Sequence, residues 1–212
     1  QLVDIVENKS GYSYGVRSIM KAKDSLSGII GVLGDLLESD AQYETALTTA
    51  LAGAVQFIVT KTDQDAREAI HFLKENKSGR ATFLPVEVMK PRSLRDDHLM
   101  VCQNFDGYLG VMSDFVRYPQ EIESVVLNQL GNIILVDTLK HASALSRATF
   151  ARYKVVTMDG EVVNIGGSLT GGTNKSQSSN FASKRELEMI KETIVSQEKE
   201  INHKKAKLNE LD

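Results

Sequence analysis

The sequence has little of the chemistry that marks secreted, membrane-bound or strongly charged proteins. Its 212 residues include one cysteine, Cys102, so no disulfide can form within the chain, and we expect a reducing, cytoplasmic setting. No apolar run approaches the length of a membrane span, and no secretory signal opens the sequence. The formal net charge of −3 excludes a strong basic field over the whole surface. With 42% hydrophobic residues, the chain can nevertheless bury a substantial core.

Patterns typical of catalysis or metal binding are missing as well. Asp96, Asp97 and Asp106 lie in a polar segment that we expect to be a solvated connection rather than an acid/base pair. Nothing resembles a nucleophile elbow. The histidines are scattered, without an acidic or cysteine partner at ligand spacing, at His71, His98, His141 and His203. We therefore expect no enzymatic activity, no metal and no cofactor.

Glycine, in contrast, is concentrated in one segment. Residues 157–172 read TMDGEVVNIGGSLTGG and contain five glycines, at Gly160, Gly166, Gly167, Gly171 and Gly172. Glycine is favoured where the backbone takes a positive φ or where another surface approaches it closely. A P-loop would need a lysine directly after the last glycine, whereas Lys175 comes two positions too late. The pattern favours a backbone surface presented to another protein over a phosphate site.

The C-terminal segment has the pattern of a coiled coil. Ser183–Glu186 (SKRE) reads as a capping box that begins a helix. Polar Gln197 and Lys204 occupy two positions of the seam that follows. Its apolar positions alternate in spacings of three and four, at Leu187, Ile190, Ile194, Ile201, Leu208 and Leu211. An amphipathic helix packed on the domain is the alternative. Residues 1–10 read as the end of an incoming helix.

The middle of the chain contains an internal duplication. The order helix, glycine stop, strand, helix, strand occurs twice, offset by about 72 to 78 residues. Such alternation predicts an α/β (mixed α+β) fold of two pseudo-repeated lobes, with sheets covered by helices. Residues 28–37 are ambiguous between a strand and a short helix. The predicted elements span 39–53, 55–60, 63–79 and 80–85 in the first copy, and 119–131, 133–136, 138–149 and 152–157 in the second.

Four segments together resemble the hinge domain of SMC proteins, and in particular of bacterial chromosome-condensing SMC proteins. They are GIIGVLGDLL (28–37), residues 43–51, GRATFLP (79–85) and residues 157–172. The resemblance covers residues 12–183. It implies the end of an incoming coiled-coil helix at 1–10, hinge lobe I at 11–97, hinge lobe II at 98–183 and the start of the outgoing helix at 184–212, the two helices forming an antiparallel coiled-coil stub. It also implies homodimerisation, the closing of a ring around DNA, and ATPase heads that lie elsewhere.

The resemblance also implies roles for particular residues. The five glycines of residues 157–172 are expected at the dimer interface, with Gly28, Gly31 and Gly34 as partners across it. Basic residues near the junction with the arms are candidates for DNA contact, namely Arg17, Lys21, Lys23, Lys184 and Arg185. For the full-length protein the resemblance implies ATPase heads, accessory subunits and a nucleoid-associated location. The alternative is a small-ligand-binding or enzymatic α/β domain with an appended helix.

Overall fold

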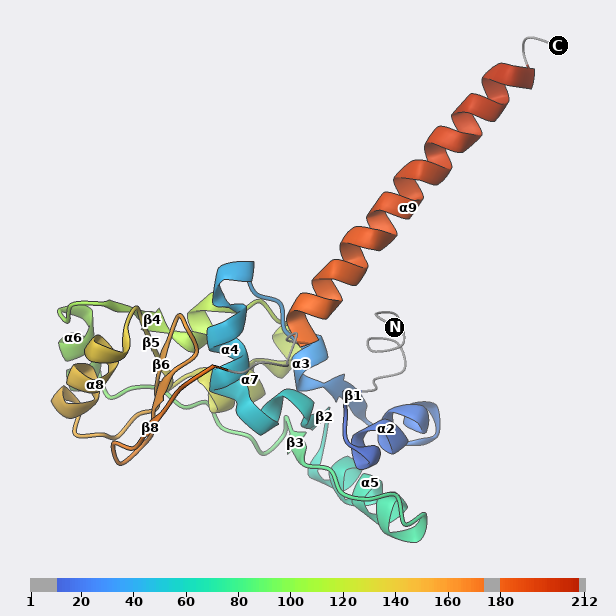
Figure 1. Ribbon diagram of the computed structural model, residues 1–212. Coiled ribbons are helices and arrows are strands. Elements are labelled where there is room, and N and C mark those ends of the chain that lie inside the picture. Colours follow the sequence, from blue (N-terminus) through green and yellow to red (C-terminus); the bar gives the residue numbers. More distant parts are fainter. Residues whose placement is uncertain (1–10, 174–179, 210–212) are drawn as a thin grey trace.

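The computed structural model describes residues 11–173 and 180–209 and shows two lobes, each built around a sheet (Figure 1). The lobe I sheet has the order β1-β2-β3, with β1 antiparallel and β3 parallel to β2. The lobe II sheet has the order β4-β5-β6-β7-β8, and only β5 and β6 are parallel. The strands are β1 (Ile29–Val32), β2 (Ile58–Thr60), β3 (Phe83–Pro85), β4 (Tyr108–Val111), β5 (Ile134–Val136), β6 (Val155–Thr157), β7 (Val162–Val163) and β8 (Leu169–Thr170).

The helices repeat in the same order in both lobes, which confirms the predicted duplication. Lobe I contains α2 (Tyr14–Lys21), α3 (Leu33–Leu36), α4 (Glu44–Leu51) and α5 (Asp63–Glu75), with 3₁₀ turns η1 (Lys23–Ser25), η2 (Ala41–Tyr43) and η3 (Ala52–Gln56). Lobe II contains α6 (Asp96–Gln103), α7 (Glu123–Leu130) and α8 (Leu139–Ala148), with η4 (Met112–Phe115) and η5 (Gln120–Ile122). The long helix α9 (Asn180–Asn209) leaves the centre of the molecule (Figure 1).

Local sequence signals explain several of these boundaries. Thr62 and Asp65 form a capping box at the start of α5, and the Thr138 hydroxyl accepts from the His141 N–H at the start of α8. Helix α7 stops at Gly131, where a Cβ would lie 2.1 Å from the Arg92 carbonyl oxygen. Residues 28–37, ambiguous in the sequence, contain both a strand and a short helix, β1 and α3.

Two sequence expectations about elements are wrong. The polar segment around Asp96 and Asp97 is not a connection, because it forms the first turn of α6; the predicted lobe boundary between residues 97 and 98 falls inside this helix. Ser183 does not cap the C-terminal helix, because α9 already begins at Asn180. The extra turn places Phe181 in the hydrophobic core, where it is 5% exposed.

The largest hydrophobic core belongs to both lobes. It joins α4 and its neighbours from lobe I with α7 and the inner face of the lobe II sheet, including Leu47, Val126 and Val156. Each lobe adds a smaller outer core, around Ile58 beneath α2 and α5 and around Ile134 beneath α6 and α8. Residues of β6 therefore point alternately into the shared and the outer core, as a strand covered on both faces requires.

Hydrogen bonds also cross between the lobes. Glu38 and Arg117 form an isolated antiparallel bridge, with reciprocal N–H···O distances of 2.9 and 2.7 Å. The Lys154 ammonium group of lobe II donates to the Thr49 and Ala50 carbonyls in the last turn of α4, at 3.4 and 3.1 Å. This contact offers a cation to the C-terminal end of a helix, which the helix dipole favours. The two lobes are thus packed and bonded as one unit.

Candidate dimerisation face and arm root

The glycine-rich segment forms the outer edge of the lobe II sheet. β8 pairs with β7 on one side, through Val162 with Thr170 and Val163 with Leu169. Among the described residues, no strand pairs with its other side. The two pairing residues of β7 are buried, whereas both residues of β8 are exposed. An exposed strand edge offers unpaired backbone groups on which another chain can form a sheet.

Glycine is required by the backbone where β7 turns into β8. The Gly167 N–H donates to the Asn164 carbonyl at 2.9 Å, and Gly166 at the third position of this turn has φ +88°. This is the geometry of a type II turn, which favours glycine at that position. The Asn164 side-chain amide donates to Thr170 Oγ1 at 3.1 Å and so holds the turn against β8. The hairpin is therefore fixed by its own hydrogen bonds.

The glycines of this hairpin have little of their own chain beside them. A Cβ built on Gly166, Gly167 or Gly172 would meet no atom of the chain within 4 Å, and all three have positive φ. Gly171 faces the aliphatic part of Glu161, while Gly160 lies against Thr45 and Thr49 of α4. Four of the five predicted interface glycines therefore line the open edge, and Gly160 supports it from within the molecule.

The glycines predicted as partners across the interface all lie in lobe I. Gly28 precedes β1 with φ +66°, and a Cβ there would collide with the Asp65 carboxylate. Gly31 is in β1, beside Leu36, and Gly34 is buried in α3. Each has a reason within its own chain to be glycine. Contact between these residues and a second copy stays a prediction.

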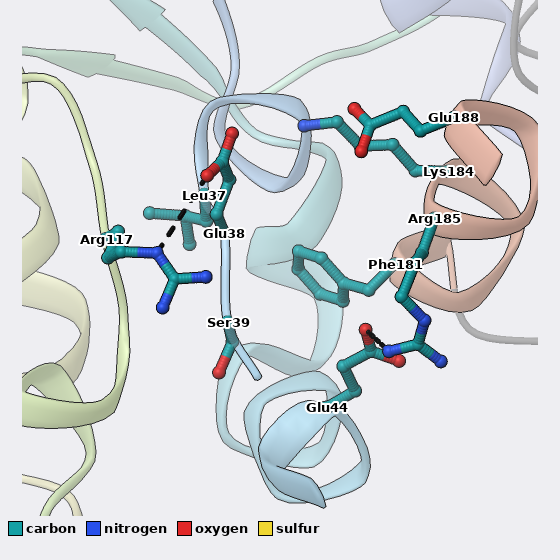
Figure 2. Close-up of a pocket in the computed structure, with 9 residues that line it drawn as sticks. All are labelled: Leu37, Glu38, Ser39, Glu44, Arg117, Phe181, Lys184, Arg185 and Glu188. Atoms are coloured by element: carbon teal, nitrogen blue, oxygen red, sulfur yellow. Dashed lines mark hydrogen bonds and ion pairs between the residues drawn. The ribbon is translucent and has the colours of Figure 1, made fainter. Parts of the chain in front are cut away.

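Helix α9 is anchored on lobe I at its first turns, which we call the arm root (Figure 2). Phe181 points toward Leu37, and the Lys184 ammonium group donates to the Asp35 carbonyl at 2.9 Å. Arg185 forms an ion pair with Glu44, whose carboxylate is almost buried at the start of α4. A cavity of about 160 Å³ separates this turn from Arg117 on the lobe II side. Sequence reasoning gave no role to Glu44 or Phe181, because the residues that they contact lie far along the chain.

Three of the five predicted DNA-contacting residues gather near this arm root. Arg17 donates to the Tyr12 carbonyl at 2.7 Å, and the Tyr12 hydroxyl donates to the Asp35 carboxylate. Burial, and then the charge of Asp35, raise the pKa of Tyr12 well above its usual value. Because Lys184 binds the same Asp35, Arg17, Lys184 and Arg185 form one neighbourhood.

The other two predicted basic residues, Lys21 and Lys23, follow Arg17 at the end of α2 and just after it. Lys21 is exposed at the end of α2, and Lys23 donates to the Ile30 carbonyl of β1 at 3.1 Å. The charges at the arm root itself are balanced, since its cavity is lined by Arg117, Lys184 and Arg185 and by three glutamates. Four of the five predicted cations therefore contact their own chain, namely Arg17, Lys23, Lys184 and Arg185.

Beyond its root, α9 carries an apolar stripe that no described residue covers. The predicted seam positions Ile190, Ile194 and Ile201 are about half exposed, whereas Leu187 is buried against the domain. Leu211 and the incoming segment 1–10 lie outside the described residues. In the described part of the chain, no group of three or more histidine, cysteine or acidic side chains could hold a metal ion. None of the described helices has the length and hydrophobicity of a transmembrane segment.

Comparison with known proteins identifies this arrangement of lobes. Residues 26–146 match the family model of the SMC proteins Flexible Hinge Domain. The chain belongs to the SMC hinge family. It is 38% identical to the Chromosome partition protein Smc of Bacillus subtilis (strain 168), over 89% of this chain and 16% of that protein. A second Smc, from Halothermothrix orenii, is also 38% identical, over 92% of this chain and 16% of the relative.

Solved hinge structures have the same fold. The chain is similar to an asymmetric dimer of the Geobacillus stearothermophilus SMC hinge domain, with a TM-score of 0.85, 38% identity and coverage of 95% of this chain and 81% of that one. The Pyrococcus furiosus SMC hinge gives a TM-score of 0.65 and 27% identity, over 84% of this chain and 91% of that one. These matches confirm the predicted mixed α/β fold and the resemblance to hinge domains.

Membership of the hinge family decides between the two functional hypotheses. The chain spans about a sixth of the length of the curated relatives it matches. As a hinge domain it is not an enzyme, because the ATPase of SMC proteins lies in separate head domains. The small-ligand or enzymatic alternative is therefore wrong.

Proposed function

We propose that this chain is the homodimerisation module of a bacterial Smc chromosome partition protein, joining two coiled-coil arms at their hinge ends. One observation carries the proposal: the exposed strand β8, flanked by glycines with open space beside their Cα atoms, lies at the outer edge of a sheet. The names of the relatives and the dimeric Geobacillus hinge support it. In the full-length protein, the partners would include ATPase heads and accessory subunits, in a cytoplasmic, nucleoid-associated location.

The two-lobed shape explains how such a dimer closes. The β8 edge of lobe II in one copy docks on lobe I of the other, near Gly28, Gly31 and Gly34. A two-fold axis then repeats the contact, so two equivalent interfaces form and no docking surface is left open. Small glycines allow close backbone approach, and the edge strand supplies hydrogen bonds. The arms leave from the arm root, so docking of the two copies sets their relative position.

Sedimentation of the 212-residue chain tests this proposal. We expect a dimer at micromolar concentration, and we expect bulky replacements at Gly166, Gly167, Gly171 and Gly172 together to give folded monomers. The matched control is Gly53→Ala, because Gly53 is exposed in lobe I with no positive φ and no neighbour beside its Cβ. A wild-type chain that sediments as a monomer, or a quadruple variant that stays dimeric, would contradict the proposal.

We further propose that DNA binds at the arm root, through Arg17, Lys184 and Arg185. Their proximity supports this site, whereas the net charge of −3 limits it to a local patch. Since Lys184 and Arg185 already bind lobe I, a phosphate must compete with the Asp35 carbonyl and the Glu44 carboxylate. Lys21, one helical turn after Arg17, and Lys23 would extend this patch along lobe I.

Electrophoretic mobility shift at several salt concentrations tests the DNA site. Affinity should fall steeply with salt, and Lys184→Ala with Arg185→Ala should weaken it. Glu44→Gln should strengthen binding, because it releases the Arg185 guanidinium from its ion pair. Glu121→Gln serves as the control for net charge, since Glu121 is exposed on η5 of lobe II. Equal effects of the two glutamine variants would show that Arg185 does not contact DNA.

A further inference from the structure

Phe150 is exposed to an unusual degree. Its side chain is 76% exposed, the highest value among the large apolar side chains of the described residues. It follows Thr149, the C-cap residue of α8, at the point where the chain turns toward β6. A single exposed apolar residue is common on protein surfaces. Phe150 differs from such residues in its backbone conformation and in its neighbours.

The backbone at Phe150 is in a conformation that favours glycine. Phe150 has φ +60° and Ala151 has φ +52°, so two consecutive residues with side chains are left-handed. The Ala151 N–H donates to the Ser146 carbonyl at 2.7 Å, which closes the end of α8 in the manner of a Schellman motif. A bulky residue at this position is strained, and glycine would end the helix equally well.

Lobe I contains the same helix ending with a different side chain. Helix α5 ends at left-handed Lys77, φ +50°, and the Ser78 N–H donates to the Leu73 carbonyl at 3.0 Å. The shared geometry shows that the motif needs a left-handed residue and not a phenyl ring. Lys77 carries a polar side chain, as an exposed turn normally does. Phe150 therefore places an apolar ring where the fold itself has no use for one.

Contacts within the chain do not account for the ring either. The described ring contact of Phe150 is a tilted one with His98, with centroids 6.1 Å apart. The His98 ring is itself held by the Tyr153 hydroxyl, 2.8 Å from Nδ1. One side of the phenyl ring thus rests on a fixed support while most of its surface remains exposed. Strained residues that the surrounding structure holds in place cluster at functional sites.

Phe150 is connected to the proposed dimerisation face. The Gly166 N–H donates to the carbonyl of Ala151 at 2.9 Å, so the turn of the glycine-rich hairpin is bonded to the residue beside Phe150. Ile165 in the same turn is 66% exposed and Leu169 of β8 is 57% exposed. The hairpin edge and the end of α8 therefore form one continuous surface with exposed apolar groups.

We propose that Phe150 is an apolar anchor of this face and is buried against lobe I of a second copy of the chain. The inference rests on the proposed homodimer, because the ring continues the surface of the β8 edge. Large aromatic side chains contribute strongly to binding when an interface covers them. The strain at Phe150 is retained because the ring is used in the dimer rather than in the folded protomer.

The experiment compares the dimer dissociation constant of the wild-type chain with those of Phe150→Ala, Phe150→Gly and Phe150→Leu, by sedimentation at a series of concentrations. Lys77→Ala and Lys77→Gly are the matched controls, because they change the same backbone motif in lobe I. We expect Phe150→Ala and Phe150→Gly to raise the dissociation constant at least tenfold, and Phe150→Leu to raise it less. The Lys77 variants should leave it unchanged. At concentrations where the protein is monomeric, Phe150→Gly should melt no lower than wild type.

The outcomes separate this inference from the dimer proposal. If the wild-type chain dimerises and the Phe150 variants bind as tightly as it does, Phe150 is not an anchor, although the homodimer stands. If the Lys77 variants weaken the dimer as much as the Phe150 variants, the effect comes from the helix ends and the inference is overturned. A wild-type chain that stays monomeric overturns both proposals.

Discussion

Replacing Gly34 by alanine separates the glycines that the fold needs from those that the dimer needs. Gly34 is buried in α3, and a Cβ there would lie 2.7 Å from both the Cγ2 atom and the carbonyl oxygen of Val55. The Val55 side chain can rotate, but its carbonyl belongs to the backbone of η3 and can move only if η3 shifts. The substitution therefore forces a shift between α3 and η3 in the shared core.

The expected magnitude follows from two opposing effects. Overpacking of a well-packed core costs about 1–3 kcal/mol. Alanine recovers about 0.5–1 kcal/mol, because glycine is a poor helix residue and φ at position 34 is not positive. Mid-range values of about 2 and 0.75 kcal/mol leave a net loss of about 1 kcal/mol, which lowers Tm by roughly 2–4 °C in a domain of this size. Gly31→Ala should cost less, because its Cβ would meet only the flexible end of Leu36, at 3.3 Å.

Thermal unfolding followed by circular dichroism, at several protein concentrations, measures this effect. A folding defect lowers the Tm of Gly34→Ala by a similar amount at low and high concentration, whereas loss of a dimer contact acts only where the dimer is populated. Sedimentation should give an unchanged dissociation constant. An unchanged Tm together with a weaker dimer would refute the reasoning and would place Gly34 at the interface itself.

Two further predictions concern single polar contacts. Tyr12→Phe should reduce the loss of stability at alkaline pH. Burial and then the charge of Asp35 raise the pKa of Tyr12, so the stability that its neutral hydroxyl contributes is complete below pH of about 10 and is lost as pH rises above it. Urea unfolding of both proteins across that pH range measures the difference. Lys154→Met should lower Tm by about 2–4 °C in a calorimetric scan, because it removes a hydrogen-bond donor that contributes about 1 kcal/mol at the end of α4. The control Lys140→Met, on the exposed face of α8, should leave Tm unchanged.

Sequence patterns predicted those parts of the fold whose signals are local. The repeated order of helices and strands was readable because glycine stops and short apolar runs bound each element, as at Gly131 and at 134–136. Helix α6 was missed because its first residues, Asp96 and Asp97, resemble a solvated linker. Only tertiary packing reveals its buried side, where His98 and Cys102 face the core of lobe II. β7 and β8 have two residues each and carry no detectable period.

In the candidate site, too, the features with a local sequence signal were predicted and those that depend on distant residues were not. The glycine-rich segment was recognisable because the positive φ at Gly166, Gly167 and Gly172 selects for glycine whatever lies far along the chain. The start of α9 was placed one turn too late: the helix begins at Asn180, and both Phe181 and Ser183 are buried in its first turns. The pairing of Arg185 with Glu44 joins residues 141 positions apart, and no local pattern predicts it.

Helix α4 contacts the arm root, the start of the glycine-rich segment and lobe II. The first residue of α4, Glu44, forms an ion pair with Arg185 of the arm root. Thr45 and Thr49 lie against Gly160, at the start of the glycine-rich segment. Lys154 of lobe II donates to the carbonyl groups of the last turn of α4. Its opposite face is buried in the core that both lobes share. Because close-packed protein interiors resist deformation, we expect a displacement at one end of α4 to affect the contacts at its other end. The arm root and the segment proposed for dimerisation therefore both contact one helix.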